Sequence, residues 1–406
     1  MSNRIWINIT IMLIQELKYI IQSAHINFLY GSGVSRPYLT TLGNIENNLT
    51  QLEKANLDKI VYNSLKASLY KAYCEGVIIP NYKFPHGNPD LIKTEKAYRD
   101  FFHIWNEIIN KRNSQLLDKQ INLFTTNIDL IVEDTLKGAS LELNDGFRGT
   151  ISPIFGESNF QISLSKSSLQ YHKYSEVPIF NLIKIHGAVN WELQQNNIVS
   201  DIYRSGRLKE LLDKIPADSF ISLEKTLSDG TIKDKAFDEL VEEAKKKKLS
   251  DAKIFDKFFD EYDKIVMINP TKEKFKTSVM DYHFYEMMRI FSNSLERENS
   301  VLFVIGFSFA DEHIAEITRR AAAVNPTLQV IVFTYDDNDV NSYLDHLNIT
   351  GQGANNNILI LTPSGLKEAN QKDENYKELF KGLDHFDLNS INRVFHSIGS
   401  SIHSSL

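Results

Sequence analysis

Two glycines one residue apart, Gly31 and Gly33, follow a short apolar run at residues 26–30. The run is rich in β-favouring side chains, which is typical of a buried parallel strand. A glycine has no Cβ, so a phosphate or a ribose could approach the backbone N–H groups closely at these two positions. The pattern alone is weak, because a G-x-G turn after a strand is more often only a tight turn.

Polar or glycine-bearing loops also follow several other predicted strands. They comprise residues 125–129 (T-T-N-I-D), 186–187 (H-G), 269–271 (N-P-T) and 306–308 (G-F-S). Ligands of open parallel sheets bind outside the carboxyl ends of the strands, so we expect these loops to converge beside residues 31–35. Each also has a simpler interpretation, since Asn127 and Asp129 could cap a helix that begins near Leu130, and a histidine after a strand is often structural. Convergence on one edge would favour a binding site.

Apolar strands that alternate with amphipathic helices must position these loops. The predicted strands are residues 26–30, 121–124, 141–143, 180–185, 265–268, 301–305, 328–333 and 358–361. Short apolar strands separated by helices are typical of a parallel sheet that is covered on both faces. The sequence therefore predicts an α/β fold with a Rossmann-like, mostly parallel sheet.

Two long segments interrupt this alternation. Residues 36–115 contain only helical patterns, and residues 192–263 are polar and charged but still show one amphipathic helix. We therefore predict a Rossmann-type domain of residues 1–35 and 116–365, two largely helical insertions (36–115 and 192–263) and a helical tail of residues 366–406. The amphipathic tail is a candidate assembly surface. A first helix near residues 13–21 should dock on the body or on a neighbouring subunit.

The composition excludes several classes of protein. The formal net charge is −7 and the pI is near 5.9, whereas a general nucleic-acid coat needs a basic surface. The one cysteine, Cys74, excludes a disulfide framework and a cysteine-rich zinc module, and it indicates a reducing compartment. The apolar segment at residues 5–14 is too short to span a bilayer and lacks a small-residue cleavage site. These features predict a cytoplasmic protein with no membrane partner.

The loop sequences resemble those of sirtuins. G-S-G-V-S at residues 31–35 is similar to the sirtuin G-A-G-x-S loop, T-N-I-D at 126–129 is similar to their Q-N-x-D segment, and His186-Gly187 is similar to the pair that carries the catalytic histidine. Three further motifs resemble the bacterial sirtuin-like branch used in anti-phage defence: N-D-G-F-R-G (144–149), K-I-H-G-A-V-N-W (184–191) and G-F-S-F-A-D-E-H (306–313). Motif order and chain length are most similar to the standalone type encoded beside a HerA-type hexameric ATPase.

This resemblance implies that NAD binds at the loops. The implied cofactor-binding residues are Gly31, Ser32, Gly33, Ser35, Thr126, Asp129, Gly306, Phe307 and Ser308. Residues 31–35 would hold the pyrophosphate, Asp129 the ribose next to nicotinamide, and Gly306 and Ser308 the adenosine half. The implied catalytic residues are Asn127, which would orient the attacking water or a ribose hydroxyl, and His186, which would take the proton from that water. Asp311 and His313 are expected to cap a helix and to make an outer contact.

The implied activity is NAD hydrolysis to nicotinamide and ADP-ribose, which would deplete NAD during anti-phage defence. The resemblance also implies control by the HerA-type ATPase, a homo-oligomer, and contact with nucleic acid only through that partner. No metal is expected, because one cysteine cannot form the four-cysteine zinc ribbon of sirtuin deacylases, and a deacylase is accordingly the least favoured activity. The alternative is a module that senses NAD or ADP-ribose without turnover and regulates an ATPase or a nuclease.

Overall fold

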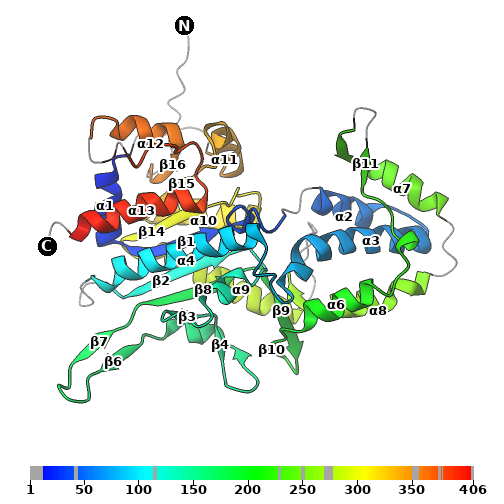
Figure 1. The fold of residues 1–406 in the computed structure, drawn as a ribbon, viewed down its shortest axis with the longest axis horizontal. Coiled ribbons are helices and arrows are strands. Elements are labelled where there is room, and N and C mark those ends of the chain that lie inside the picture. The colour runs from blue at the N-terminus through cyan, green and yellow to red at the C-terminus, as the bar shows by residue number, and fades with distance from the viewer. Residues whose placement is uncertain are drawn as a thin grey trace, which may run out of the picture.

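A computed structural model describes residues 12–40, 44–112, 117–226, 230–247, 252–268, 278–349, 356–373, 376 and 378–403. The chain forms a central α/β body, a smaller antiparallel sheet and a lobe beside the body (Figure 1). None of the described helices is long and apolar enough to cross a membrane.

Seven parallel strands form the central sheet, in the order β16-β15-β14-β1-β2-β8-β3. They are β1 (His25–Tyr30), β2 (Gln120–Thr125), β3 (Glu142–Asn144), β8 (Ile179–Lys184), β14 (Ser300–Ile305), β15 (Gln329–Phe333) and β16 (Ile358–Leu361). Every neighbouring pair in this sheet is parallel. The predicted Rossmann-like α/β fold is confirmed.

Successive side chains of β1 enter two separate cores, because they point to opposite faces of the sheet. Phe28 and Tyr30 pack on one face and Leu29 on the other. The first face is covered by α1 (Ile14–Ser23), α4 (Pro89–Asn110), α5 (Ile131–Leu136), α12 (Pro363–Asn370) and α13 (Leu388–His403). The second is covered by α9 (Ser278–Glu296), α10 (Glu312–Val324) and α11 (Val340–His346). Burial on both faces explains why these strands are almost continuously apolar.

Four asparagines form a row across the apolar strands. Asn27 of β1 lies in register with Asn122 of β2, which is in register with Asn181 of β8 and, through it, with Asn144 of β3. The Nδ2 of each asparagine donates to Oδ1 of the preceding one, at 2.9, 3.0 and 2.9 Å. A one-residue slip would break every bond in the row and leave buried amides unpaired, so the row fixes the register of these strands.

A second, five-stranded sheet lies beside the body, in the order β13-β9-β10-β5-β4. Its strands are β4 (Phe147–Arg148), β5 (Ile154–Phe155), β9 (Gly187–Gln194), β10 (Asn197–Ser200) and β13 (Ile265–Met267), and a separate hairpin of β6 (Ser165–Ser167) and β7 (Tyr174–Glu176) extends from the body (Figure 1). The predicted strand at 265–268 therefore forms, but its placement in the α/β alternation is wrong, because β13 pairs antiparallel with β9. A short strand buried on both sides suits either sheet, and its apolar pattern does not specify the partner.

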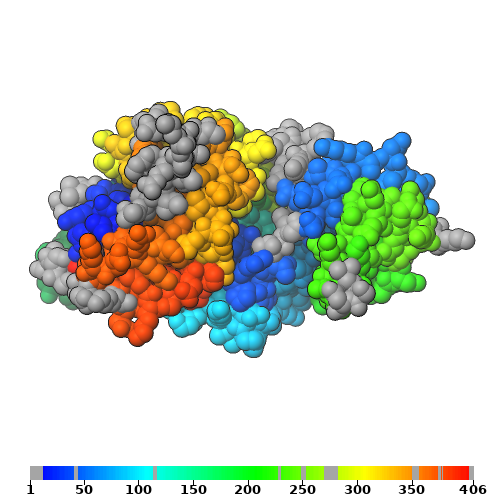
Figure 2. Space-filling view, turned by 90° about the horizontal axis from the view of Figure 1, so that it is seen from above, coloured from blue at the N-terminus to red at the C-terminus, as the bar shows by residue number. Residues whose placement is uncertain are grey.

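Parts of both predicted insertions fold together into one lobe (Figure 2). Its elements are α2 (Ile45–Lys54), α3 (Lys59–Tyr73), α6 (Arg204–Leu212), α7 (Phe237–Lys246), α8 (Asp256–Tyr262), β11 (Glu224–Thr226) and β12 (Ile232–Asp234). Leu65, Leu208 and Leu240 are fully buried in one shared core. The second segment thus also contains strands, which the prediction of a helical insertion omitted.

The last helix of the first predicted insertion belongs to the body and not to the lobe. Phe101 and Trp105 of α4 each pack edge-on against Phe28 of β1, with ring centroids 5.0 Å apart. Helix α4 therefore covers the central sheet as the crossover between β1 and β2, and the inserted part of the segment ends before it.

Both terminal helices also pack on the body. Leu17 and Ile21 of α1 are fully buried, so the first helix docks on this chain, as one of the two predicted options stated. Ile391, Phe395 and Ile398 of α13 are fully buried against the sheet and α4. The apolar face of the tail therefore packs within the chain itself, and assembly through the remainder of the tail stays a prediction.

Candidate functional site

The loops after β14, β1, β2 and β8 lie side by side at the carboxyl edge of the sheet, because these strands are neighbours. From β1 the chain builds the sheet outward through β2 and β8, whereas β14, β15 and β16 extend the sheet from the opposite side of β1. The strand order therefore reverses between β1 and β14. Open parallel sheets bind ligands at such a switch point. A cavity of about 1090 Å³ lies at this edge. Of the predicted site residues, all except Gly31 line it: Ser32, Gly33, Ser35, Thr126, Asn127, Asp129, His186, Gly306, Phe307 and Ser308. The predicted loop at 269–271 falls outside the described residues.

The two glycines after β1 make room for protein backbone. A Cβ on Gly31 would lie 2.4 Å from the carbonyl oxygen of Gly306, and a Cβ on Gly33 would lie 2.9 Å from Cα of Gly306. Gly306 itself has φ +62°, a conformation that favours glycine. The N–H groups of Gly31 and Gly33 donate to the carbonyl oxygens of Ile305 and Gly306 at 3.2 and 3.1 Å. The two glycines therefore allow the loops after β1 and β14 to pack closely against each other. A bound phosphate would need hydrogen-bond donors other than these two N–H groups.

We expect a Gly31→Ala variant to lose about 1–3 kcal/mol of the free energy of unfolding, because the added methyl group meets backbone atoms that cannot rotate away. Urea unfolding would measure the change. Gly87→Ala is the matched control, since nothing lies within 4 Å of a Cβ there, and its effect should stay within about 0.5 kcal/mol. Equal stabilities of the two variants would contradict the close packing of the loops.

A chain of hydrogen bonds orients Asn127 at the end of β2. Its Nδ2 donates to the carbonyl oxygen of Gly31 (2.9 Å) and to Oγ of Ser35 (3.0 Å), and this Oγ donates to Oδ2 of Asp129 (2.8 Å). Because a backbone carbonyl oxygen only accepts, the amide nitrogen of Asn127 must face Gly31. Oδ1 of Asn127 is therefore the atom that can accept from a ligand.

Asp129 has a structural role as well as a place in the cavity. Its Oδ1 accepts from the N–H of Ile131 (3.1 Å) at the start of α5, so the capping contact considered from the sequence is present. Its carbonyl oxygen accepts from Nζ of Lys184, a buried side chain that also pairs with Glu133 at 3.2 Å. Burial raises the pKa of Glu133, and Lys184 opposes the rise. Lys184 thus ties the loop after β2 to β8, the strand that leads to His186.

His186 lies where the chain turns from β8 into β9, and its carbonyl oxygen accepts from the N–H of Ile268 (2.9 Å). Its Nε2 is 3.1 Å from Oδ2 of Asp311, without the alignment of a hydrogen bond. Oδ1 of Asp311 accepts from the N–H groups of His313 and Ile314, which confirms Asp311 as the N-cap of α10. An imidazole beside a carboxylate can take up a proton, because the carboxylate stabilises the imidazolium that forms.

Several side chains of the cavity were not predicted. They are Arg36, Glu46, Tyr73, Lys93, Tyr335 and Asp387. Tyr335 lies two residues after β15, so the strand-end argument that found the other loops could have found it. The remaining side chains come from the loop that leads to the lobe, the lobe itself, α4 and the segment before α13, and no local pattern indicates that these parts meet at the sheet edge.

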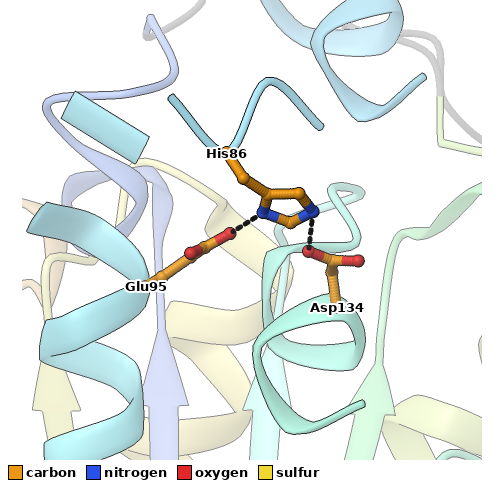
Figure 3. Close-up of side chains that lie close together, drawn as sticks. All are labelled: His86, Glu95 and Asp134. Carbon is orange, nitrogen blue, oxygen red and sulfur yellow. Dashed lines mark hydrogen bonds and ion pairs between the residues drawn. The ribbon is translucent and has the colours of Figure 1, made fainter. Parts of the chain in front are cut away.

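A separate cluster of one histidine and two carboxylates lies at the start of α4 (Figure 3). Nδ1 of His86 is 3.2 Å from Oε1 of Glu95, and its Nε2 is 3.8 Å from Oδ2 of Asp134. Burial raises the pKa of the nearby Tyr38 to about 12, and these two carboxylates add to the rise. A metal ion needs ligand atoms that converge on one point, whereas here each carboxylate faces a different ring nitrogen. We interpret the cluster as a polar contact that joins the loop before α4 to α4 and α5.

The cavity thus combines an oriented amide oxygen, an imidazole–carboxylate pair and two cationic side chains, Arg36 and Lys93. These groups can bind a phosphate-bearing ligand, position a water molecule and accept its proton. Comparison of the sequence with models of known protein families and with curated proteins finds no match.

Proposed function

We propose that this protein is an NAD hydrolase that cleaves the bond between nicotinamide and ribose. The observation that carries the proposal is that Asn127, His186 and Asp311 line one large cavity at the switch point of a Rossmann-like sheet. Sheets of this type bind dinucleotides at that point. The cavity therefore suits NAD in both position and chemistry.

In the proposed reaction, water attacks C1′ of the nicotinamide ribose while the C–N bond breaks and its electron pair returns to the pyridinium nitrogen. The transition state resembles an oxocarbenium ion, so the protein must position the water and remove its proton, and it needs no strong nucleophile. Oδ1 of Asn127 accepts from the water or from a ribose hydroxyl. His186 takes the proton, and Asp311, 3.1 Å away, stabilises the imidazolium. The products are nicotinamide, ADP-ribose and one proton.

Side chains supply the charge that the pyrophosphate requires. The N–H groups of Gly31 and Gly33 already donate to carbonyl oxygens, so they are poor candidates for a phosphate cradle. Arg36 and Lys93 line the same cavity and carry positive charge, and Ser32 adds a hydroxyl. We propose that these three side chains, together with the ends of the loops, bind the two phosphates.

The biological setting of the proposal comes from the sequence motifs. The similarity of residues 144–149, 184–191 and 306–313 to the sirtuin-like anti-phage branch supports NAD depletion during defence. The same similarity supports a homo-oligomer that acts in the cytoplasm, without zinc, under control of a HerA-type ATPase. The protein would then contact nucleic acid only through that ATPase.

Chromatographic quantification of NAD, nicotinamide and ADP-ribose tests the proposal. The purified full chain, incubated with NAD for hours at high protein concentration, should release equal amounts of nicotinamide and ADP-ribose. An Asn127→Ala variant should release them about a hundredfold more slowly, because the water or ribose loses the group that orients it. Asn47→Ala, on an exposed part of α2, is the control and should match the wild type.

Intact NAD in the wild-type reaction, both without and with the neighbouring HerA-type ATPase, would overturn the proposal. If NAD nevertheless protected the protein against thermal unfolding, the result would favour an NAD-sensing module in place of a hydrolase.

A further inference from the structure

The end of the cavity beside β15 carries an exposed aromatic ring that stacks on a histidine. Tyr335 lines the cavity and is 54% exposed, and its ring stacks on that of His385 with centroids 4.6 Å apart and an interplanar angle of 4°. His385 thus covers one face of the Tyr335 ring, and it is not among the residues that line the cavity. The N–H of Phe386 donates to the carbonyl oxygen of Tyr335 (2.9 Å), which holds the two segments together. One flat face of a fixed aromatic ring is thus left for a ligand.

A carboxylate follows on the same segment, two residues after His385. Asp387 also lines the cavity, and its Oδ1 accepts from the N–H of Ser390 (2.8 Å) at the start of α13. The side chain is half-buried and belongs to the segment that His385 and Phe386 fix against Tyr335. An acidic side chain at the edge of a Rossmann-like sheet can accept hydrogen bonds from the 2′-hydroxyl of a ribose and repel a phosphate in that position.

We infer that Tyr335 and Asp387 form the adenosine subsite of the cavity and that they select adenosine nucleotides without a 2′-phosphate. The inference rests on the proposed function for the orientation of the ligand. Strands β15 and β2 are three strand spacings apart, which is roughly 14 Å. A dinucleotide whose nicotinamide ribose lies at Asn127 therefore reaches Tyr335 with its purine. The purine stacks on the free face of Tyr335, and the ribose hydroxyls donate to Asp387.

Calorimetric titration of the full chain with ADP, which contains the adenosine half and no scissile bond, tests the subsite without requiring turnover. Tyr335→Ala should weaken ADP binding about tenfold, because the stacked base loses its platform. Tyr335→Phe should bind ADP as the wild type does, since it keeps the ring. Tyr203→Ala, at an exposed tyrosine next to α6, is the control and should change nothing.

Titration with NAD and NADP tests Asp387. The Asp387→Asn variant keeps a helix cap of equal quality but loses the charge. We expect the wild type to bind NAD at least tenfold more tightly than NADP, and the variant to lose most of this difference. Nicotinamide mononucleotide, which lacks the adenosine half, should bind equally to the wild type and to the Tyr335 and Asp387 variants.

The outcomes separate this inference from the proposed hydrolase. ADP binding that depends on Tyr335 would support the subsite even if NAD stayed intact in every reaction. Equal ADP affinity of the wild type and Tyr335→Ala, or no difference between NAD and NADP in the wild type, would overturn the subsite even if NAD were hydrolysed.

Discussion

A His186→Ala variant is expected to release nicotinamide from NAD at least a hundredfold more slowly than the wild type. General bases contribute about 10²- to 10⁴-fold to the rates of enzymes, and His186 is the imidazole that lines the cavity. The side chain lies two residues after β8, outside the strand itself, and is 13% exposed. Chromatographic measurement of nicotinamide over time gives the rate directly.

Two controls make this result specific. His103→Ala removes an exposed histidine of α4, and its rate should equal that of the wild type. ADP should bind to His186→Ala as it does to the wild type, because His186 and the aromatic ring of Tyr335 follow strands at different positions of the sheet, β8 and β15. A rate within threefold of the wild type would remove His186 from the proposed mechanism while leaving the other residues of the cavity in place.

The sheet was predictable because most of its seven strands are apolar enough to be recognised one at a time. Residues 26–30 and 301–305 are examples, and both lie in the parallel sheet as predicted. The strand at 265–268 was recognised in the same way but placed in the wrong sheet, because the apolar sequence of a buried strand does not show which strand it pairs with. The row that begins with Asn27 and Asn122 was not predicted, because it depends on a strand register that only the folded sheet supplies.

The residues of the candidate site that directly follow parallel strands were predictable from the sequence. Parallel strands bring Ser35, Asn127 and His186 to one edge regardless of what is inserted between them. Lys93 and Asp387 reach the same cavity only because α4 and α13 pack on the sheet, and this packing involves residues far apart in the chain. The glycine at position 31 was recognised as a place of close approach, but the sequence could not show that the approaching group is the backbone of Gly306.

The second large effect is expected in the lobe, where an Arg204→Met variant should lose about 3–5 kcal/mol of the free energy of unfolding. The guanidinium of Arg204 is fully buried and lies 2.6 Å from Glu192, 3.3 Å from Asp201 and 3.2 Å from Glu261. Methionine fills a similar volume but removes the fully buried cation at the centre of the cluster. Glu192 then loses this partner, while Asp201 keeps only Arg207 and Glu261 keeps Arg207 and Lys264. Breaking a buried ion-pair network in this way is costly. Urea unfolding would measure the loss, and Arg319→Met, in an exposed pair on α10, should cost no more than about 0.5 kcal/mol.

The same network predicts how the lobe responds to acid. Burial favours the neutral forms of Asp201 and Glu261, but it is outweighed. Arg207 donates hydrogen bonds to both carboxylates, the N–H of Tyr203 donates to Asp201 and Lys264 donates to Glu261, and the charges of Arg207 and Arg204 add to these bonds. The pKa of each carboxyl therefore lies below its ordinary value of 3.8 or 4.5. A lowered pKa in the folded state gives stability that is present above the ordinary value and is lost as the pH falls through the folded value. The free energy of unfolding of the wild type should therefore decrease below about pH 4. The decrease should be shallower in Arg204→Met, and identical acid profiles would show that Arg204 does not hold these carboxylates in their charged form.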